Sequence, residues 1–208
     1  MKPIKKTILE SALVLFNEQG FVNVRLQHIA DKASISVGNL AYHFKNKEEI
    51  ILFFYKKIKV NQELLLSECK VLPLFEDIDF LIKKIFTLQQ HYSFFYFDTL
   101  EFMRAFPLIA EKHSLFLQFQ RKQIQFMIEF NASRGSFVQQ QYEHQFSQLT
   151  EVFCITMDNW MSHQYLNGVE ILSSADYCNT LWAILRPLFT DMGLVEFRQM
   201  GKYSLISF

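Results

Sequence analysis

The most restrictive feature of the sequence is a run of seventeen residues, Ser34 to Ile50, which carries the signals for two successive helices. Ser36 is suited to cap the first helix, because its hydroxyl can accept a free backbone N–H of the first turn. Asn46 is suited to cap the second helix, and Glu49, three residues later, can complete a capping box. The run therefore predicts a tight turn, a short helix and the start of a longer helix.

The short helix has two different faces. Ile35, Leu40 and Phe44 have helical spacing and are expected to point inward. The outward positions carry one residue without a side chain and three polar groups: Gly38, Asn39, Tyr42 and His43. Lys47 lies in the first turn of the longer helix, where a cation opposes the helix dipole. A contact with a phosphate group would account for a lysine at this position.

A second apolar stripe lies just upstream, formed by Leu26, Ile29 and Ala30, and predicts another short helix over residues 26–33. Two short helices joined by Ser34-Ile35-Ser36 predict a helix-turn-helix. In that motif the second helix enters the major groove of DNA.

These motifs resemble the N-terminal domain of the TetR family of transcriptional regulators. The resemblance covers residues 4–55 and rests on Ile29-Ala30, the run from Ala33 to Leu40, His43-Phe44 and Lys47-Glu48. It implies a DNA-binding head whose contacts come from Arg25, Gln27, Ser36, Val37, Gly38, Asn39, Tyr42, His43 and Lys47.

The sequence departs from the family pattern at several positions. Val24 replaces a threonine that caps the second helix, so Asn23 is the expected substitute. His28 stands at a position that is usually acidic, and Ser34 replaces a glycine in the turn. A side chain in a left-handed turn costs about 1 kcal/mol, which a fold can absorb.

One further departure concerns DNA directly. Ala41 replaces a tyrosine that normally touches DNA in the family, and Tyr42 is the candidate to compensate. Tyr42 is rotated from that position by about 100° around the helix.

The charge distribution supports a DNA-binding head, although the net charge of the chain is zero. Residues 1–60 hold ten Lys or Arg and five Asp or Glu, whereas residues 61–208 hold eleven and sixteen. Ordinary surface charge is the plainer interpretation, but a basic head on an acidic body is expected if only the head meets DNA. Lys2, Lys5 and Lys6 at the start of the first helix are either a solvated tail or phosphate contacts.

The rest of the sequence has helical spacing throughout and no strand-like alternation. Helices are predicted over residues 4–19, 48–70, 76–91, 92–106, 107–133, 142–166 and 175–192. The predicted fold is all-α, with a three-helix head over residues 1–47 and a helical ligand-binding and dimerisation body over residues 48–208.

Single residues mark the limits of the last predicted helix. Ser174 is a suitable cap, Pro187 predicts a kink or an early end, and Gly193 is expected to close the helix. Residues 194–208 have no predicted element.

The body contains an unusually aromatic stretch, residues 92–106, with an acidic residue, Asp98, within an aromatic stripe. Each of these residues taken singly is more simply a core residue. Together with a few polar groups, however, they have the composition of a pocket for a small molecule. The candidate lining is Tyr92, Phe95, Tyr96, Asp98, Phe102, Met103, His113, Phe116, Phe119, Gln123, Met127 and Phe153. On this hypothesis Phe102→Ala and Asp98→Ala keep operator binding but respond less to ligand.

The resemblance implies a homodimer through the last two long helices, with Phe153, Trp160 and Trp182 among the candidate interface residues. The plainer alternative is that both helices only close their own core. A two-fold dimer would bind double-stranded DNA at an inverted-repeat operator.

Catalysis is not expected, because the sequence has no GxSxG, HExxH, GxGxxG or GxxxxGK[ST] motif. Its six histidines lack ligand spacing, and Cys69, Cys154 and Cys178 form neither a disulfide framework nor a CxxC pattern. We therefore expect no catalytic residue, metal or cofactor. The sequence shows no signal peptide or membrane span, so a cytoplasmic protein is expected.

The sequence thus predicts a dimeric TetR-like regulator, with repression relieved by a small apolar or amphipathic effector. The rival hypothesis is an all-helical enzyme or carrier of apolar ligands with a degenerate DNA-binding head. The basic head with Gly38, His43 and Lys47 favours the regulator.

Overall fold

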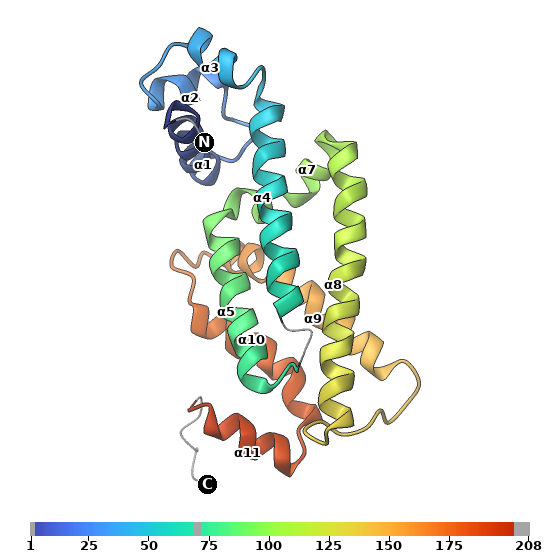
Figure 1. Cartoon of the computed structure of the whole chain (residues 1–208). Coiled ribbons are helices and arrows are strands. Elements are labelled where there is room, and N and C mark those ends of the chain that lie inside the picture. Colours follow the sequence, from blue (N-terminus) through green and yellow to red (C-terminus); the bar gives the residue numbers. More distant parts are fainter. Residues whose placement is uncertain (1–2, 69–71, 202–208) are drawn as a thin grey trace. The chain divides into compact units, whose positions relative to one another are not determined.

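The structure is a computed structural model, and it describes residues 3–68 and 72–201 (Figure 1). All regular elements among these residues are helical, apart from one isolated β-bridge between Phe137 and Phe189. The all-α prediction is therefore confirmed. Lys2 and Cys69 lie outside the described residues, and Cys154 and Cys178 are both free thiols.

The chain forms two compact units, and neither is continuous in sequence. The first, here called the head unit, contains residues 3–61 and 88–113. The second, the body unit, contains the described part of residues 62–87 and residues 114–201. The functional boundary predicted between residues 47 and 48 stays a prediction, but compact packing does not divide the chain at that point.

The head unit begins with the three helices of the predicted motif. They are α1 (Pro3–Gln19), α2 (Leu26–Lys32) and α3 (Val37–His43), followed by the start of α4 (Lys47–Glu68). The other elements of the unit are the end of α5 (Phe75–His91), α6 (Ser93–Phe97), α7 (Thr99–Ala105) and the start of α8 (Pro107–Ser133). Among the short helices, α3 has a side-chain cap from Ser36, whereas α6 and α7 have no side-chain cap hydrogen bond. Helices this short are stabilised mainly by packing.

Aromatic side chains join residues 91–106 to the N-terminal helices of the head unit. The ring of Phe94 lies 5.4 Å from that of Phe16, and the ring of Phe102 lies 4.4 Å from that of Phe21. Asn17 ties the same two segments together through its side-chain amide. Its Nδ2 donates to the carbonyl oxygen of His91 at 3.0 Å, and its Oδ1 accepts from the backbone N–H of Phe94 at 3.1 Å.

The single helix predicted over residues 92–106 is in fact two helices. The helix is interrupted at Asp98, whose φ of −111° and ψ of 22° are not helical, so α6 ends there and α7 begins. The break lets Phe94, Phe95 and Phe102 all turn into the same core, where each is at most 1% exposed.

The body unit contains the remaining parts of α4, α5 and α8, together with α9 (Gln145–Leu166), α10 (Ser174–Leu185), η1 (Arg186–Leu188) and α11 (Asp191–Gln199). Its core includes Trp182, which is fully buried and donates its indole N–H to Asp79 at 3.0 Å. Phe75 lies 5.2 Å from Trp182, and Phe197 on α11 lies 4.9 Å from it.

The end of the chain differs from the prediction at Ser174 and at Gly193 and agrees with it at Pro187. Ser173, not Ser174, caps α10, because its hydroxyl accepts the N–H of Asp176. The helix ends at Leu185, just before Pro187, which confirms the early end. Gly193 does not close a helix but lies within α11. This helix includes residues 194–199, for which no element was predicted.

Candidate nucleic-acid interface

Helix α3, which the sequence predicts to enter the major groove of DNA, is built as expected. Leu40 is fully buried and Phe44 is 3% exposed, so one face of the helix is anchored in the head unit. The Ser36 hydroxyl caps the helix by accepting the N–H of Asn39 at 3.1 Å. On the opposite face Gly38 and Asn39 are exposed, and Tyr42 keeps 79% of its surface exposed.

The turn before α3 takes the strained conformation that the departure from glycine implies. Ser34 has a φ of 54°, in the left-handed region. Backbone hydrogen bonds hold the turn, from Ser34 to the carbonyl of Asp31 and from Ile35 to that of Ala30, both at 3.0 Å. These bonds fix the angle between α2 and α3 despite the unfavourable residue.

Helix α2 is capped differently from the prediction. Asn23 does not cap it, since its amide donates to the carbonyl of Gln19 on α1 at 2.8 Å. Instead, the backbone N–H of Arg25 donates to Nδ1 of His28 at 3.3 Å. An imidazole nitrogen thus accepts the hydrogen bond that an acid could accept at this position, which explains how the helix tolerates His28.

Two predicted DNA contacts on this helix are exposed, namely Arg25 and Gln27. The Gln27 amide donates to the carboxylate of Asp31 at 2.6 Å, which holds its side chain along the outside of α2. Val37, His43 and Lys47 are half-buried, whereas Ser36 is exposed.

Lys47 has a structural partner that the sequence did not reveal. Its ammonium donates to the carbonyl oxygens of Phe21 at 2.8 Å, Val24 at 2.9 Å and Val22 at 3.3 Å. All three donors of the ammonium are thus used by the loop between α1 and α2. Partial burial lowers the pKa of Lys47, while the neighbouring Glu48 raises it. The loop contact accounts for a cation in the first turn of α4 without a phosphate.

The start of α4 is capped largely as predicted. The side chain of Asn46 accepts the N–H of Glu49 at 3.0 Å. Glu49 in turn accepts the N–H of Lys45, also at 3.0 Å, rather than that of the cap residue.

The residues predicted to line a ligand pocket fall into two groups, because they belong to different compact units. The head unit contains Tyr92, Phe95, Tyr96, Asp98, Phe102, Met103 and His113. The body unit contains Phe116, Phe119, Gln123, Met127 and Phe153. Within the head unit, Phe95 and Phe102 pack ring to ring at 5.2 Å and take part in the core around α1. This packing gives the aromatic run a role in holding the head together.

Three titratable members of the head-unit group have shifted pKa values, and burial raises that of Tyr92. His113 packs edge-on against Tyr55 and Phe95, and burial lowers its pKa to about 4. Burial also raises the pKa of Asp98, and the nearby Glu101 adds to the shift. Two arginines form ion pairs with other acids, Arg104 with Glu101 at 2.7 Å and Arg121 with Glu151 at 2.8 Å, so neither pair involves Asp98.

The aromatic residues predicted for the dimer interface are buried within the chain itself. Phe153 is 1% exposed, Trp160 is 7% exposed and Trp182 is fully buried. Trp160 also donates its indole N–H to the hydroxyl of Thr180 at 3.2 Å. That part of the prediction is wrong, since these side chains fill the core of their own body unit.

Comparisons with known proteins agree with the helix-turn-helix geometry. A family model described as "Bacterial regulatory proteins, tetR family" matches residues 8–52, and one described as "Bacterial transcriptional repressor" matches residues 61–197. The second match covers more than half of the chain. The chain belongs to the TetR family of bacterial transcriptional regulators. This membership does not favour the rival hypothesis of an enzyme or carrier.

Individual relatives are similar over different lengths. A probable helix-turn-helix regulator of Bacillus subtilis, YttP, is 26% identical over 79% of this chain and 81% of its own length. The Escherichia coli regulator RutR is 41% identical, but only over 26% of each chain. A TetR-family regulator from Marinobacter aquaeolei has the same fold, with a TM-score of 0.85, 24% identity and coverage of 99% of this chain and 100% of that one.

Among the helices of the described residues, none combines the length and the apolar character needed to cross a membrane.

Proposed function

We propose that this TetR-family regulator represses transcription by binding an inverted-repeat operator as a homodimer and is released by a small apolar or amphipathic effector. The observation that carries the DNA-binding part is the two-faced helix α3. Leu40 fixes its inner face, and Asn39 and Tyr42 stand exposed on its outer face. Exposed amide and phenol groups on a rigid helix can reach base edges in the major groove.

The DNA-binding role is tested by comparing sequence-reading and loop-holding residues. Asn39→Ala and Tyr42→Ala should change which operator sequence is preferred, with a loss of about 1–3 kcal/mol for each lost base contact. Lys47→Ala should instead lower the melting temperature of the protein, because it removes three hydrogen bonds from the loop. Fluorescence anisotropy on the chain's own upstream DNA and on a scrambled duplex, at several salt concentrations, separates these effects.

The outcome for Lys47 distinguishes two roles. A folded Lys47→Ala variant with an unchanged melting temperature and a shallower salt dependence would indicate the phosphate contact predicted from sequence. Equal losses on both duplexes for Asn39→Ala and Tyr42→Ala would contradict the assignment of α3 as the recognition helix.

The proposed dimer surface lies on the exposed faces of α9 and α10. Val152 and Ile155 on α9 are 50% and 54% exposed, and they share a helical stripe with Leu166, which is 82% exposed. On α10, Asn179 and Ala183 are also exposed. Small residues on one helix and aliphatic residues on the other allow close packing across a two-fold axis. Ile155→Glu should lower the fraction of dimer measured by sedimentation. The buried residues Trp160 and Trp182 are not part of this proposed surface.

The proposed effector site lies in the body unit, where α8 carries Phe116, Phe119, Gln123 and Met127. A buried polar residue on the same helix supports a ligand with a hydrogen-bond donor. Gln120 is 2% exposed and donates to Asp158 on α9 at 3.0 Å, while its Oε1 has no hydrogen-bond partner among the described residues. Native mass spectrometry of the purified protein, followed by operator release with the molecule it identifies, tests this part.

A further inference from the structure

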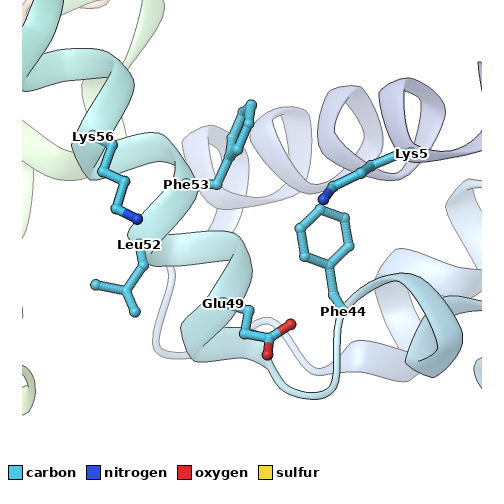
Figure 2. Close-up of a pocket in the computed structure, with 6 residues that line it drawn as sticks. All are labelled: Lys5, Phe44, Glu49, Leu52, Phe53 and Lys56. Carbon is cyan, nitrogen blue, oxygen red and sulfur yellow. The ribbon is translucent and has the colours of Figure 1, made fainter. Parts of the chain in front are cut away.

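The head unit contains an open groove on the side of α1 and α4. Its volume is about 250 Å³, and Figure 2 shows the six residues that line it: Lys5, Phe44, Glu49, Leu52, Phe53 and Lys56. Lys5 comes from the first turn of α1, and Phe44 is the residue that caps the end of α3. The other four residues lie on α4. Three separate elements of one compact unit therefore build the groove.

The floor of the groove is apolar. Phe44 is 3% exposed, so its ring is fixed by the core beneath it, and Phe53 is partly buried against the same core. Leu52 retains 38% exposure and adds an aliphatic wall. Such a surface favours an apolar group that can leave water on contact.

The rim of the groove has an excess of positive charge. Figure 2 shows the ammonium groups of Lys5 and Lys56 directed into it from opposite sides. The Lys5 ammonium lies 4.8 Å from the centre of the Phe44 ring, which favours a cation at that place. Among the described residues, no carboxylate forms an ion pair with either lysine.

The one acidic residue of the groove already has a structural role. Glu49 accepts the backbone N–H of Lys45 at 3.0 Å through Oε2, so its carboxylate caps the start of α4. Two lysines therefore remain for an anion, against one carboxylate that is held in place.

We propose that this groove binds a small amphipathic anion, in which a carboxylate or phosphate meets Lys5 and Lys56 and a short alkyl or aryl group covers Phe44, Leu52 and Phe53. Charge complementarity selects the anion, because ammonium groups at the rim form charge-assisted hydrogen bonds with its oxygens. The apolar floor selects the tail. The groove is small, so the tail is of the order of a hexyl chain or a single ring. This site is separate from the effector site proposed for the body unit and does not depend on it.

The test is a titration of the full-length protein labelled with ¹⁵N, followed by chemical shifts of the backbone amides. The probes are hexanoate, hexyl phosphate, hexanol and inorganic phosphate at constant ionic strength. Hexanoate, hexyl phosphate or both should shift amides in residues 3–8 and 44–56, and comparing the two shows whether the carboxylate or the phosphate is preferred. Hexanol and inorganic phosphate should each bind at least about tenfold more weakly, a difference of about 1.4 kcal/mol.

Matched variants locate the site. Lys5→Met combined with Lys56→Met should weaken anion binding at least about tenfold, whereas Lys6→Met should leave it unchanged. Lys6 is the right control because it lies next to Lys5 on α1 but pairs with Glu10 at 3.6 Å. Leu52→Trp should block the groove by filling it, and the partial exposure of Leu52 leaves room for the larger ring outside the core.

Four results would overturn the proposal. They are equal shifts with hexanol, equal shifts with inorganic phosphate, an equal loss in Lys6→Met, and shifts confined to the body unit. Equal binding of inorganic phosphate would indicate a plain phosphate contact at Lys5, which is one of the two interpretations of the N-terminal lysines. Operator binding of the unliganded protein, measured separately by anisotropy, tests the proposed function independently of all these outcomes.

Discussion

Each compact unit has an aromatic cluster, and the two clusters arise from very different stretches of sequence. The head cluster contains Phe16, Phe21, Phe94, Phe95 and Phe102, three of which come from one dense aromatic run. The body cluster contains Phe75, Phe137, Trp182, Phe189 and Phe197, which come from five separate segments. The dense run has the composition of a ligand pocket, but its rings pack against α1. The scattered residues have no local signature in the sequence, but they hold α11 in place. Local density therefore does not reveal what an aromatic residue contacts.

The largest effects are expected from removing one ring from each cluster. Phe102 and Phe75 are both fully buried, so Phe102→Ala and Phe75→Ala should each cost about 3–5 kcal/mol of unfolding free energy. Hydrogen exchange with mass spectrometry should show faster exchange in residues 3–61 and 88–113 for Phe102→Ala. For Phe75→Ala the faster exchange should lie in the body unit.

The burial of Phe102 also changes how strongly the Phe102→Ala variant is expected to bind the operator. A ring that contacts Phe21 and Phe94 supports the helix-turn-helix, so Phe102→Ala should weaken operator binding rather than only reduce the response to ligand. Full operator affinity with normal stability in this variant would contradict the structural role of the head cluster.

The parts that sequence predicted correctly are those fixed by neighbouring residues. The cap of α3 by Ser36, the inward position of Leu40 and the left-handed Ser34 each depend on a few residues in a row. The end of α10 before Pro187 depends on a proline that cannot continue the hydrogen-bond pattern. Most of the candidate DNA-binding face follows from such local rules.

The parts that sequence missed depend on contacts between distant residues. Lys47 donates to carbonyls that lie 23 to 26 residues earlier, and no spacing rule predicts that contact. Asn17 bridges to residues more than 70 positions away. The break at Asp98 occurs because aromatic residues on both sides turn into one core, which is a tertiary effect.

The next expected effect concerns how the body cluster holds α11. A Cβ atom built on Gly193 would clash with the carbonyl oxygen of Ser136, so only glycine allows this approach. Gly193→Ala should cost about 1–3 kcal/mol by forcing α11 away, and Trp182 fluorescence should report it, because Phe197 lies 4.9 Å from that indole. Val195→Ala is the matched control, since Val195 lies on the same helix and is 52% exposed. Similar losses in both variants would show that the close approach does not matter.

A pH-dependent effect of similar size is expected at the edge of the head cluster. His113 has a pKa of about 4 in the fold and 6.5 in the unfolded chain, because it is buried against Phe95 and Tyr55. The unfolded chain binds more protons between these values, so stability should fall as the pH drops from 6.5 to 4, by up to about 3 kcal/mol. Urea unfolding of His113→Phe should lack this part of the pH dependence. An unchanged slope in the variant would show that another group causes it.

The smallest expected effect is at Asp98, the acidic residue between α6 and α7. Its Oδ2 lies 3.2 Å from where a Cβ on Gly20 would be, so the carboxyl sits over the end of α1. Burial and then Glu101 raise its pKa, so the folded state holds the proton more tightly and loses stability as the pH rises above 3.8. Asp98→Asn should therefore stabilise the head unit at pH 7, by less than about 1 kcal/mol because a partly exposed charge is screened. Thermal melts at pH 7 and pH 3 measure the gain and its expected disappearance in acid. A destabilised Asp98→Asn at pH 7 would instead mean that the carboxylate makes a favourable contact, as a ligand-orienting acid would.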